Sequence, residues 1–276
     1  MITVYQRILT RFLNVLAHSH RPWVKHAFIF IVMRLYPNIN LAEAEITEWR
    51  DYPSFNAFFT RALKVGARPL DTHPKTLVSP VDGVLVSSGA IEGDQILQVK
   101  GKRYALSTLL GPAHYSWAIK NGFSTTLYLR PDCYHRIHMP CTGRLQSMHF
   151  IPGHLYSVGP HNTQNRFGLF SQNERLVTLW ETDYGRLAVV MVGAMLVSGM
   201  ATVWHGLVDA NTHQKPTSWS YDRHAVMLDK GDEMGCFHYG STVILVLERA
   251  VDWQVSIAPK VFIQMGQALL CDLQPE

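Results

Sequence analysis

From about residue 75 onward the chain consists of short apolar runs separated by Gly, Pro, Asp and Asn. Runs rich in β-branched and aromatic residues, with turn residues between them, are typical of strands. The sequence therefore predicts an α+β fold: a mostly antiparallel β sandwich or barrel-like body, preceded by a group of amphipathic helices. The expected strands cover residues 84–91, 95–100, 124–130, 143–150, 176–182, 186–192, 195–203, 242–248 and 268–271.

Helical patterns are confined to residues 1–65, which we expect to form a membrane-associating region ahead of a β-rich catalytic domain at 66–276. Apolar residues recur there at helical spacing. Pro22 suits the first turn of the second helix, and Ser54 suits the N-cap of the fourth. The predicted helices cover residues 3–18, 22–35, 41–49 and 55–63.

Positive charge is concentrated at the start of the chain. The whole sequence has 25 Lys and Arg against 21 Asp and Glu, yet residues 1–36 contain no acidic residue and the bases Arg7, Arg11, Arg21, Lys25 and Arg34. A basic amphipathic segment with aromatic residues suits an anionic membrane surface. An ordinary helical hairpin packed on its own core is the alternative. We expect a membrane surface, and no nucleic acid, as the partner of this region.

Compartment and membrane topology follow from two further features. The longest strongly apolar run, residues 27–33, is far shorter than the ~20 residues that span a bilayer. Four cysteines in a chain of 276 residues, without a recognisable signal peptide, favour a reducing compartment over a disulfide framework.

Two polar segments within the β-rich part could carry chemistry. Asp82 lies at an Asp-Gly turn, where a carboxylate that bonds only its own backbone is the ordinary interpretation. His135 and His138 lie between two prolines and are expected to project in different directions from a loop. Together with Cys133 and Cys141 they offer four zinc-ligand types within nine residues, but structural zinc sites usually draw ligands from two separated knuckles. We expect no metal.

A third feature is the Gly240-Ser241 pair, where an exposed polar turn precedes the apolar run 242–248. Ser241 should stand at the mouth of a buried strand. Asp82, His138 and Ser241 could supply an orienting acid, a base and a hydroxyl nucleophile. A membrane-associated serine hydrolase is one interpretation, although the chain lacks the Gly-x-Ser-x-Gly elbow at this serine and the strand pattern does not suit an α/β hydrolase.

Several ordered motifs resemble the bacterial, membrane-associated phosphatidylserine decarboxylases. They are SPVDG at 79–83, YHRIHMP at 134–140 and GCFHYGSTVI at 235–244, with FNAFFTR at 55–61, ARP at 67–69 and ILQVKG at 96–101. The resemblance extends over nearly the whole chain. One position departs from it, because Tyr239 stands where the family motif usually has leucine before Gly-Ser-Thr.

The resemblance implies that the precursor cuts itself between Gly240 and Ser241, giving a β chain of residues 1–240 and an α chain of residues 241–276 that stay associated. His138, held by Asp82, would be the base, and Ser241 would become a covalent pyruvoyl cofactor. Through a Schiff base, that group would convert phosphatidylserine to phosphatidylethanolamine and CO₂. His135 would position the substrate carboxylate or assist protonation, and the two histidines could exchange duties.

The resemblance also implies a peripheral membrane protein on the cytoplasmic face of the bacterial inner membrane. A two-chain phospholipid rarely leaves the bilayer, so the basic helices of residues 1–36 would bring the enzyme to its substrate. A homodimer is left open, as is acyl-chain preference.

Overall fold

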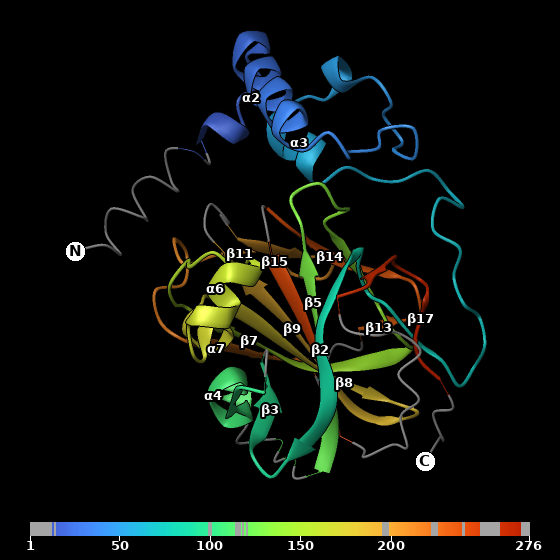
Figure 1. Ribbon diagram of the computed structural model, residues 1–276, viewed down its shortest axis with the longest axis vertical. Coiled ribbons are helices and arrows are strands. Elements are labelled where there is room, and N and C mark those ends of the chain that lie inside the picture. Colours follow the sequence, from blue (N-terminus) through green and yellow to red (C-terminus); the bar gives the residue numbers. More distant parts are fainter. Residues whose placement is uncertain are drawn as a thin grey trace.

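The computed structural model describes residues 13, 15–98, 101–113, 117, 119, 121–194, 199–221, 226–238, 241–248 and 260–271. Its β body is built on an 11-stranded sheet in which all named pairs are antiparallel (Figure 1). Its path runs β12 (Thr217–Ser220), β7 (Gly143–Ile151), β8 (Arg175–Thr182), β9 (Gly185–Gly193), β15 (Ser241–Leu247), β5 (Asn121–Leu129), β2 (Gly83–Glu92), β3 (Gln95–Leu97) and β4 (Arg103–Ala105). Off this path, β13 (Met227–Leu228) pairs with β7 and β16 (Phe262–Ile263) with β2.

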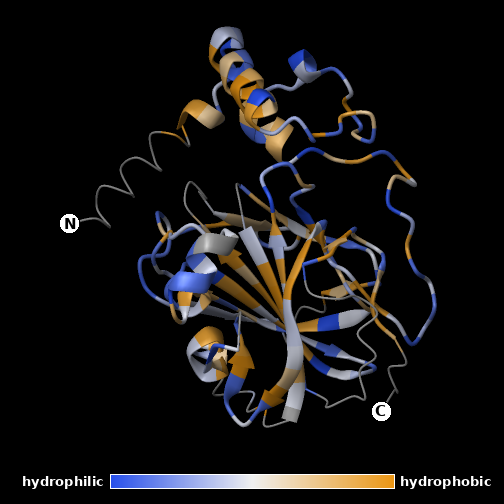
Figure 2. Ribbon diagram, in the orientation of Figure 1, coloured by the Kyte–Doolittle hydropathy of each residue, from blue (hydrophilic) through white to orange (hydrophobic). Residues whose placement is uncertain are grey.

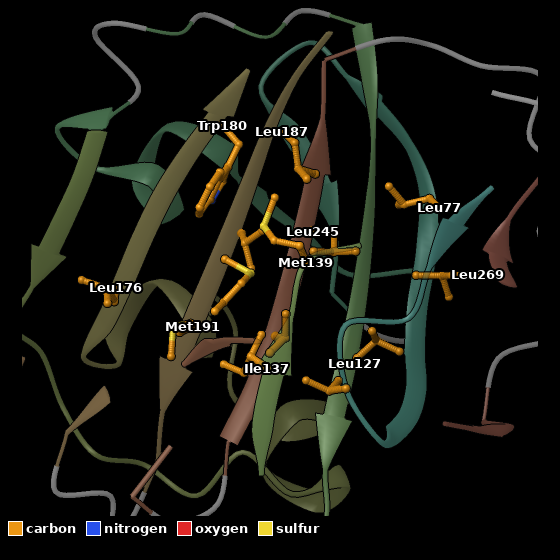
Figure 3. Close-up of a cluster of buried hydrophobic side chains, with 14 of the residues drawn as sticks. Leu77, Leu127, Ile137, Met139, Leu176, Trp180, Leu187, Met191, Leu245 and Leu269 are labelled. Atoms are coloured by element: carbon orange, nitrogen blue, oxygen red, sulfur yellow. The ribbon is translucent and has the colours of Figure 1, made fainter. Parts of the chain in front are cut away.

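Two smaller sheets lie against the large one. The first has four strands in the order β11 (Gly206–Val208), β10 (Met200–Thr202), β14 (Glu233–Phe237) and β6 (Arg136–His138); the second pairs β1 (Leu77–Val78) with β17 (Ala268–Leu270). Ile137 from β6 packs in one buried cluster with Met191 and Leu245 from the large sheet (Figure 3). The predicted antiparallel sandwich is confirmed, and the described strands do not close into a barrel.

Strand β15 occupies a central position in the large sheet. It pairs with β5 on one side and β9 on the other over its full length. Val243, Leu245 and Leu247 pack into the sandwich core, whereas Ile244 and Val246 pack into a second cluster on the opposite face. Burial on both faces explains the continuous apolar run, because neither face of this strand meets water.

Helices α2 (Pro22–Leu35) and α3 (Phe55–Phe59) lie together at one end of the β body (Figure 1). The predicted helix at 22–35 is confirmed, with Pro22 in its first turn. Lys25 ties α2 to the following segment by donating to the carbonyls of Arg50 (3.1 Å) and Tyr52 (2.7 Å). Shorter elements complete the set: η1 (Trp49–Asp51), α4 (Leu106–Leu110), α6 (Pro160–Asn165) and α7 (Leu169–Gln172).

Two helix predictions need correction for one physical reason. The Ser54 hydroxyl caps α3 as expected, accepting from Ala57 N at 3.1 Å, but the helix ends at Phe59 rather than at residue 63. No helix spans residues 41–49, which form turns before η1. Instead, residues 43–45 exchange backbone hydrogen bonds with residues 62–64 around an Ala44–Leu63 bridge. This long-range pairing takes the backbone groups that both helices would need.

The segments around the histidines and before Ser241 also differ from expectation. His138 ends strand β6 rather than lying in a loop, and residues 233–237 form β14 rather than a polar turn. These two strands pair with each other, with Glu233 opposite His138 and Cys236 opposite Arg136. Neither has the alternating pattern of a typical strand, so both depend on pairing: β6 pairs with β14, and β14 pairs with β6 and β10.

Most of the predicted helix at 3–18 lies outside the described residues, as do 99–100 and 195–198 of two predicted strands. The other predicted strands are confirmed to within a few residues at each end. Figure 2 shows apolar residues on α2 as well as inside the β body. No helix in the described part of the chain has both the length and the hydrophobicity needed to cross a bilayer.

Candidate active site

Ser241 is the first residue of β15, opposite Leu129 on β5 and Gly193 on β9. Its side chain is 0% exposed, which corrects the expectation of an exposed turn at this residue. Within the described part of the chain, its hydroxyl has no hydrogen-bond partner, nor has that of Thr242. An unpaired buried hydroxyl costs about 1–3 kcal/mol. Gly240, on the other side of the predicted cleavage point, lies outside the described residues.

His138 is held in one tautomer by two hydrogen bonds. Its Nδ1 lies 2.7 Å from the carbonyl oxygen of Gly231, which can only accept, so Nδ1 carries the proton. Nε2 therefore accepts the hydroxyl of Tyr134 at 2.9 Å. Burial lowers the pKa of His138, against opposing effects of the Gly231 carbonyl and the Glu233 carboxylate. The ring is thus neutral at pH 7, with Nε2 as its basic atom.

Asp82 is buried close to His138 but is not hydrogen-bonded to it. Its carboxylate accepts two-pronged hydrogen bonds from Arg68, at 2.7–3.1 Å, and one from Met265 N at 2.9 Å. Arg68 also pairs with Glu43 at 2.7 Å. The expected Asp82–His138 contact is therefore absent, because a bidentate guanidinium is a stronger partner for a buried carboxylate than a neutral imidazole.

His135 lies in an apolar setting immediately before β6. Its ring is 0% exposed and stacks on Phe59 of α3, with ring centroids 4.0 Å apart. Neither ring nitrogen has a partner with hydrogen-bond geometry among the described residues. Burial, aided by the positive charge of Arg61, lowers the pKa of His135 to about 3, so the ring is neutral. The His135 carbonyl accepts from Phe237 N at 3.1 Å, which joins this segment to the end of β14.

Two adjoining pockets lie between the helices and the β body. The larger, of about 820 Å³, is lined mainly by apolar residues of α2, α3 and the β body, including Phe28, Phe59 and Tyr128. The smaller, of about 200 Å³, is polar and contains Arg61, Arg68, Asp82, Asp132 and Tyr134 among its lining residues. Asn38, Arg130 and Asp132 line both.

Strand register relates Ser241 to the larger pocket. The residues opposite Ser241 are Leu129 and Gly193, and the next residue of each strand, Arg130 and Ala194, lines that pocket. The sheet therefore brings the start of β15 to the end of a large apolar cavity next to a small polar one. That combination suits an amphiphile with a charged headgroup.

The described residues do not assemble a hydrolase triad. Such a triad needs acid–base and base–nucleophile hydrogen bonds, and neither is present among the described residues. A metal centre is not formed either in the described part of the chain. Burial raises the pKa of Cys133 and of Cys141 to about 12, so both thiols are protonated at neutral pH.

Arg61, Arg68 and Tyr134 lie in the sequence motifs, but no functional role was expected for them. All three line the polar pocket. One sequence signal could have drawn attention to Arg61: it follows the aromatic run of α3, where a charged side chain needs a reason to be buried. No local signal distinguishes Arg68 or Tyr134 from ordinary surface residues.

Comparison with known proteins gives consistent matches. A profile of the phosphatidylserine decarboxylase family matches residues 55–271, which include Asp82, His135, His138 and Ser241. The chain is 43% identical over 264 residues to the phosphatidylserine decarboxylase proenzyme of Xanthomonas oryzae pv. oryzae, covering 95% of this chain and 93% of that one. It is 45% identical over 233 residues to the proenzyme of Marinobacter nauticus, covering 83% and 81%. The Azotobacter vinelandii proenzyme is 43% identical over 267 residues, covering 95% and 93%.

Proposed function

Because the chain belongs to the phosphatidylserine decarboxylase family, we propose that it is a self-processing decarboxylase that converts phosphatidylserine to phosphatidylethanolamine and CO₂. The observation that carries this proposal is the buried Ser241 hydroxyl at the start of β15, which has no hydrogen-bond partner among the described residues. Ser241 pairs with Leu129 and Gly193, whose next residues, Arg130 and Ala194, line the apolar cavity. A buried hydroxyl without a partner is costly for structure alone and suits an atom that reacts once with its own backbone.

Self-processing would begin with attack of Ser241 Oγ on the carbonyl carbon of Gly240. The amide C–N bond breaks as an ester forms, and the proton of the hydroxyl passes to a base. Loss of the Cα proton of residue 241 then expels the Gly240 carboxylate and leaves dehydroalanine. Hydrolysis with release of ammonia yields a pyruvoyl group at the new chain start. Serine is required because its oxygen is both the nucleophile and the leaving group.

His138 is suited to be the base in this sequence. Its neutral ring offers Nε2 as acceptor, while the Gly231 carbonyl holds the opposite nitrogen in the protonated state. The Tyr134 hydroxyl occupies Nε2 before reaction, so a proton would reach His138 through Tyr134 or after this hydroxyl turns away. Asp82 would act on His138 through its charge, which raises the pKa of His138 and so works against the effect of burial. The Asp82 carboxylate also holds Arg68 and the backbone N–H of Met265 by hydrogen bonds.

A pyruvoyl group at residue 241 would supply a ketone that condenses with the substrate amine and takes up the electron pair left by departing CO₂. His135 would border the substrate carboxylate as a neutral ring that stacks on Phe59 and has no side-chain hydrogen bond among the described residues. A carboxylate loses its charge as CO₂ leaves, so weakly polar surroundings favour the transition state over the bound substrate.

The two chains would remain together after cleavage. Residues 241–247 pair with β5 and β9 along the full strand, and their side chains enter both hydrophobic clusters. A strand held on both edges and both faces does not leave when one peptide bond breaks. The new chain start would therefore stay at the end of the apolar cavity.

Membrane attachment is the remaining part of the proposal. Trp23 and Phe30 of α2 are 71% and 62% exposed, Ile31 and Leu35 are also exposed, and Arg34 adds positive charge at the last turn. Large exposed apolar side chains with adjacent basic residues suit the interface of an anionic bilayer. We place the enzyme as a peripheral protein on the cytoplasmic face of the bacterial inner membrane.

Denaturing mass spectrometry of the expressed protein tests the proposal. We expect the 31.3 kDa chain to give two fragments, the smaller beginning with a pyruvoyl group derived from Ser241. The fragments should co-elute under native conditions and release CO₂ from phosphatidylserine. Ser241→Ala should stay intact and inactive. A wild-type chain that remains whole while showing decarboxylase activity would refute the self-processing mechanism.

A further inference from the structure

Arg61 is a buried arginine whose guanidinium lies 5.8 Å from the centroid of the Phe58 ring but has no carboxylate partner among the described residues. It is 5% exposed and follows the end of α3. One nitrogen, Nη2, donates to the backbone carbonyls of Asp132 (3.2 Å) and Cys133 (3.3 Å). The other two, Nε and Nη1, have no hydrogen-bond partner in the described part of the chain. No carboxylate of the described residues pairs with this guanidinium.

The neighbouring arginines of the polar pocket are different. Arg68 pairs with Asp82 and Glu43 at 2.7 Å, and Arg130 pairs with Asp132 at 2.9 Å. Of the three described arginines that line this pocket, Arg61 alone lacks an ion pair. Burial lowers the pKa of Arg61, with smaller effects of Tyr52, Cys133, Asp82 and Arg68. Arginine nevertheless stays protonated at neutral pH, so the pocket contains a fixed positive charge.

A structural role accounts for only part of this arrangement. The two carbonyl contacts hold residues 132–133, but they use one nitrogen and need a donor rather than a charge. Nε and Nη1 each keep N–H groups without an acceptor, and because these groups lie on different sides of the planar guanidinium, each can donate to a separate oxygen atom. A buried charge normally has a counter-ion, and here none comes from the described protein.

We propose that Arg61 binds an oxyanion of the phospholipid headgroup in the polar pocket, through its charge and a free N–H group of Nε or Nη1. This inference rests on the proposed function. Two groups of the substrate share the required chemistry: the phosphodiester and the serine carboxylate. The phosphodiester is the better match, since its charge persists through the reaction, whereas a cation held on the carboxylate stabilises the bound substrate more than the transition state.

The pocket arrangement is consistent with this assignment. Asn38, Arg130 and Asp132 line both cavities, so a headgroup at Arg61 would adjoin acyl chains in the apolar one. His135 is close enough for the charge of Arg61 to lower its pKa and is separated from bulk solvent. An anion at Arg61 would therefore leave the neutral His135 beside the part of the headgroup that reacts.

Three variants test the proposal. Arg61→Gln removes the charge but keeps a donor for the two carbonyls, Arg61→Lys keeps the charge, and Arg144→Gln is the control on an exposed arginine paired with Glu181 outside both pockets. Cleavage is measured by mass spectrometry, and KM and kcat with phosphatidylserine in mixed micelles. Glycerophosphoethanolamine, with phosphate but no carboxylate, and O-methylserine, with carboxylate but no phosphate, serve as competing ligands.

With the phosphodiester at Arg61, Arg61→Gln should raise KM and the inhibition constant of glycerophosphoethanolamine about 10- to 100-fold, with kcat nearly unchanged. With the carboxylate there, the inhibition constant of O-methylserine should rise instead, and kcat should change. Either result supports an anion site, and Arg61→Lys should recover part of the loss. If Arg61 served only as a donor to the two backbone carbonyls, the KM, kcat and inhibition constants of Arg61→Gln should lie at least as close to the wild-type values as those of Arg61→Lys.

Cleaved Arg61→Gln with wild-type KM, kcat and inhibition constants would overturn the inference while leaving the proposed function intact. A wild-type chain that neither cleaves nor decarboxylates would instead overturn the proposed function. If Arg61→Gln blocks cleavage, the comparison moves to Ser241→Ala proenzyme with and without the change, titrated with the same two ligands. Equal affinities there also overturn the inference, and a tenfold or greater loss for one ligand supports it.

Discussion

Single hydrogen bonds decide the chemistry available at His138. The Gly231 carbonyl fixes the proton on Nδ1, so the other nitrogen is the one that can accept. The arrangement differs from the Asp82–His138 pair expected from the motifs, because Asp82 is engaged by Arg68 and Met265. Asp82 therefore acts on the site through its charge and through Arg68, and the tautomer of His138 is set by the Gly231 carbonyl.

The pH dependence of self-cleavage should report this environment. Burial lowers the pKa of His138 below the usual value of about 6.5, and only the neutral ring can accept a proton. The cleavage rate of freshly made proenzyme should therefore stay near its pH 7 value at pH 6.5 and fall only at lower pH. Quenched samples analysed by denaturing electrophoresis would measure the rate. An acid limb centred above 6.5 would contradict the assignment of His138 as the base.

At the scale of elements, the site depends on β14, the strand that leads toward Ser241. Gly235 pairs with Thr202 of β10, and a Cβ built on Gly235 would lie 1.9 Å from the carbonyl oxygen of Ala201. That oxygen belongs to backbone, which cannot move aside cheaply. The close approach of β10 and β14 thus requires glycine at this position.

Gly235→Ala should separate β10 from β14, destabilise the fold by about 3 kcal/mol and slow self-cleavage. The matched control is Gly89→Ala in β2, where an added Cβ meets nothing within 4 Å. The control should change stability by less than about 0.5 kcal/mol. Urea denaturation of uncleaved Ser241→Ala proenzyme, with and without each change, separates stability from processing. Equal midpoints for the two glycine variants would disprove the packing argument.

At the scale of the whole molecule, α2 has two sides that differ in their surroundings. One side packs with α3, through Phe28 against Phe55, and lines the apolar cavity. The opposite side leaves Trp23 and Phe30 exposed. Deleting residues 1–36 would therefore remove a cavity wall together with the proposed membrane contact, so point variants are the sharper test.

Trp23→Ser with Phe30→Ser should weaken binding to anionic phospholipid vesicles at least tenfold, because each large side chain contributes about 1.5–3 kcal/mol when buried. The control is Val203→Ser, an exposed apolar residue of the β body. Vesicle sedimentation at two salt concentrations measures binding and its electrostatic part. Wild-type binding by the double variant would contradict a membrane role for α2.

Elements whose signals lie within one short stretch of the chain were predictable from the sequence. The apolar run after Ser241, Pro22 at the start of α2 and Ser54 before α3 are local signals, and each marks an element that begins within a residue or two of the predicted position. The prediction of a helix at residues 41–49 was wrong because residues 43–45 form backbone hydrogen bonds with residues 62–64. These bonds occupy N–H and C=O groups that the helix would need. Strands β6 and β14 were missed because each depends on pairing with strands far away in the sequence: β6 pairs with β14, and β14 pairs with both β6 and β10.

The sequence by itself determined the antiparallel β body, the two-sided burial of the strand after Ser241 and, through its motifs, the family. The tertiary structure alone decided which groups meet: Asp82 with Arg68, His138 with Tyr134 and Gly231, and Arg61 with no counter-ion among the described residues. The physical reason is the separation along the chain of the residues that interact. Periodicity and capping act between residues close in the chain, whereas some partners at this site, such as Gly231 for His138 and Met265 for Asp82, come from segments far away in the sequence. Partner choice also depends on competition among buried groups.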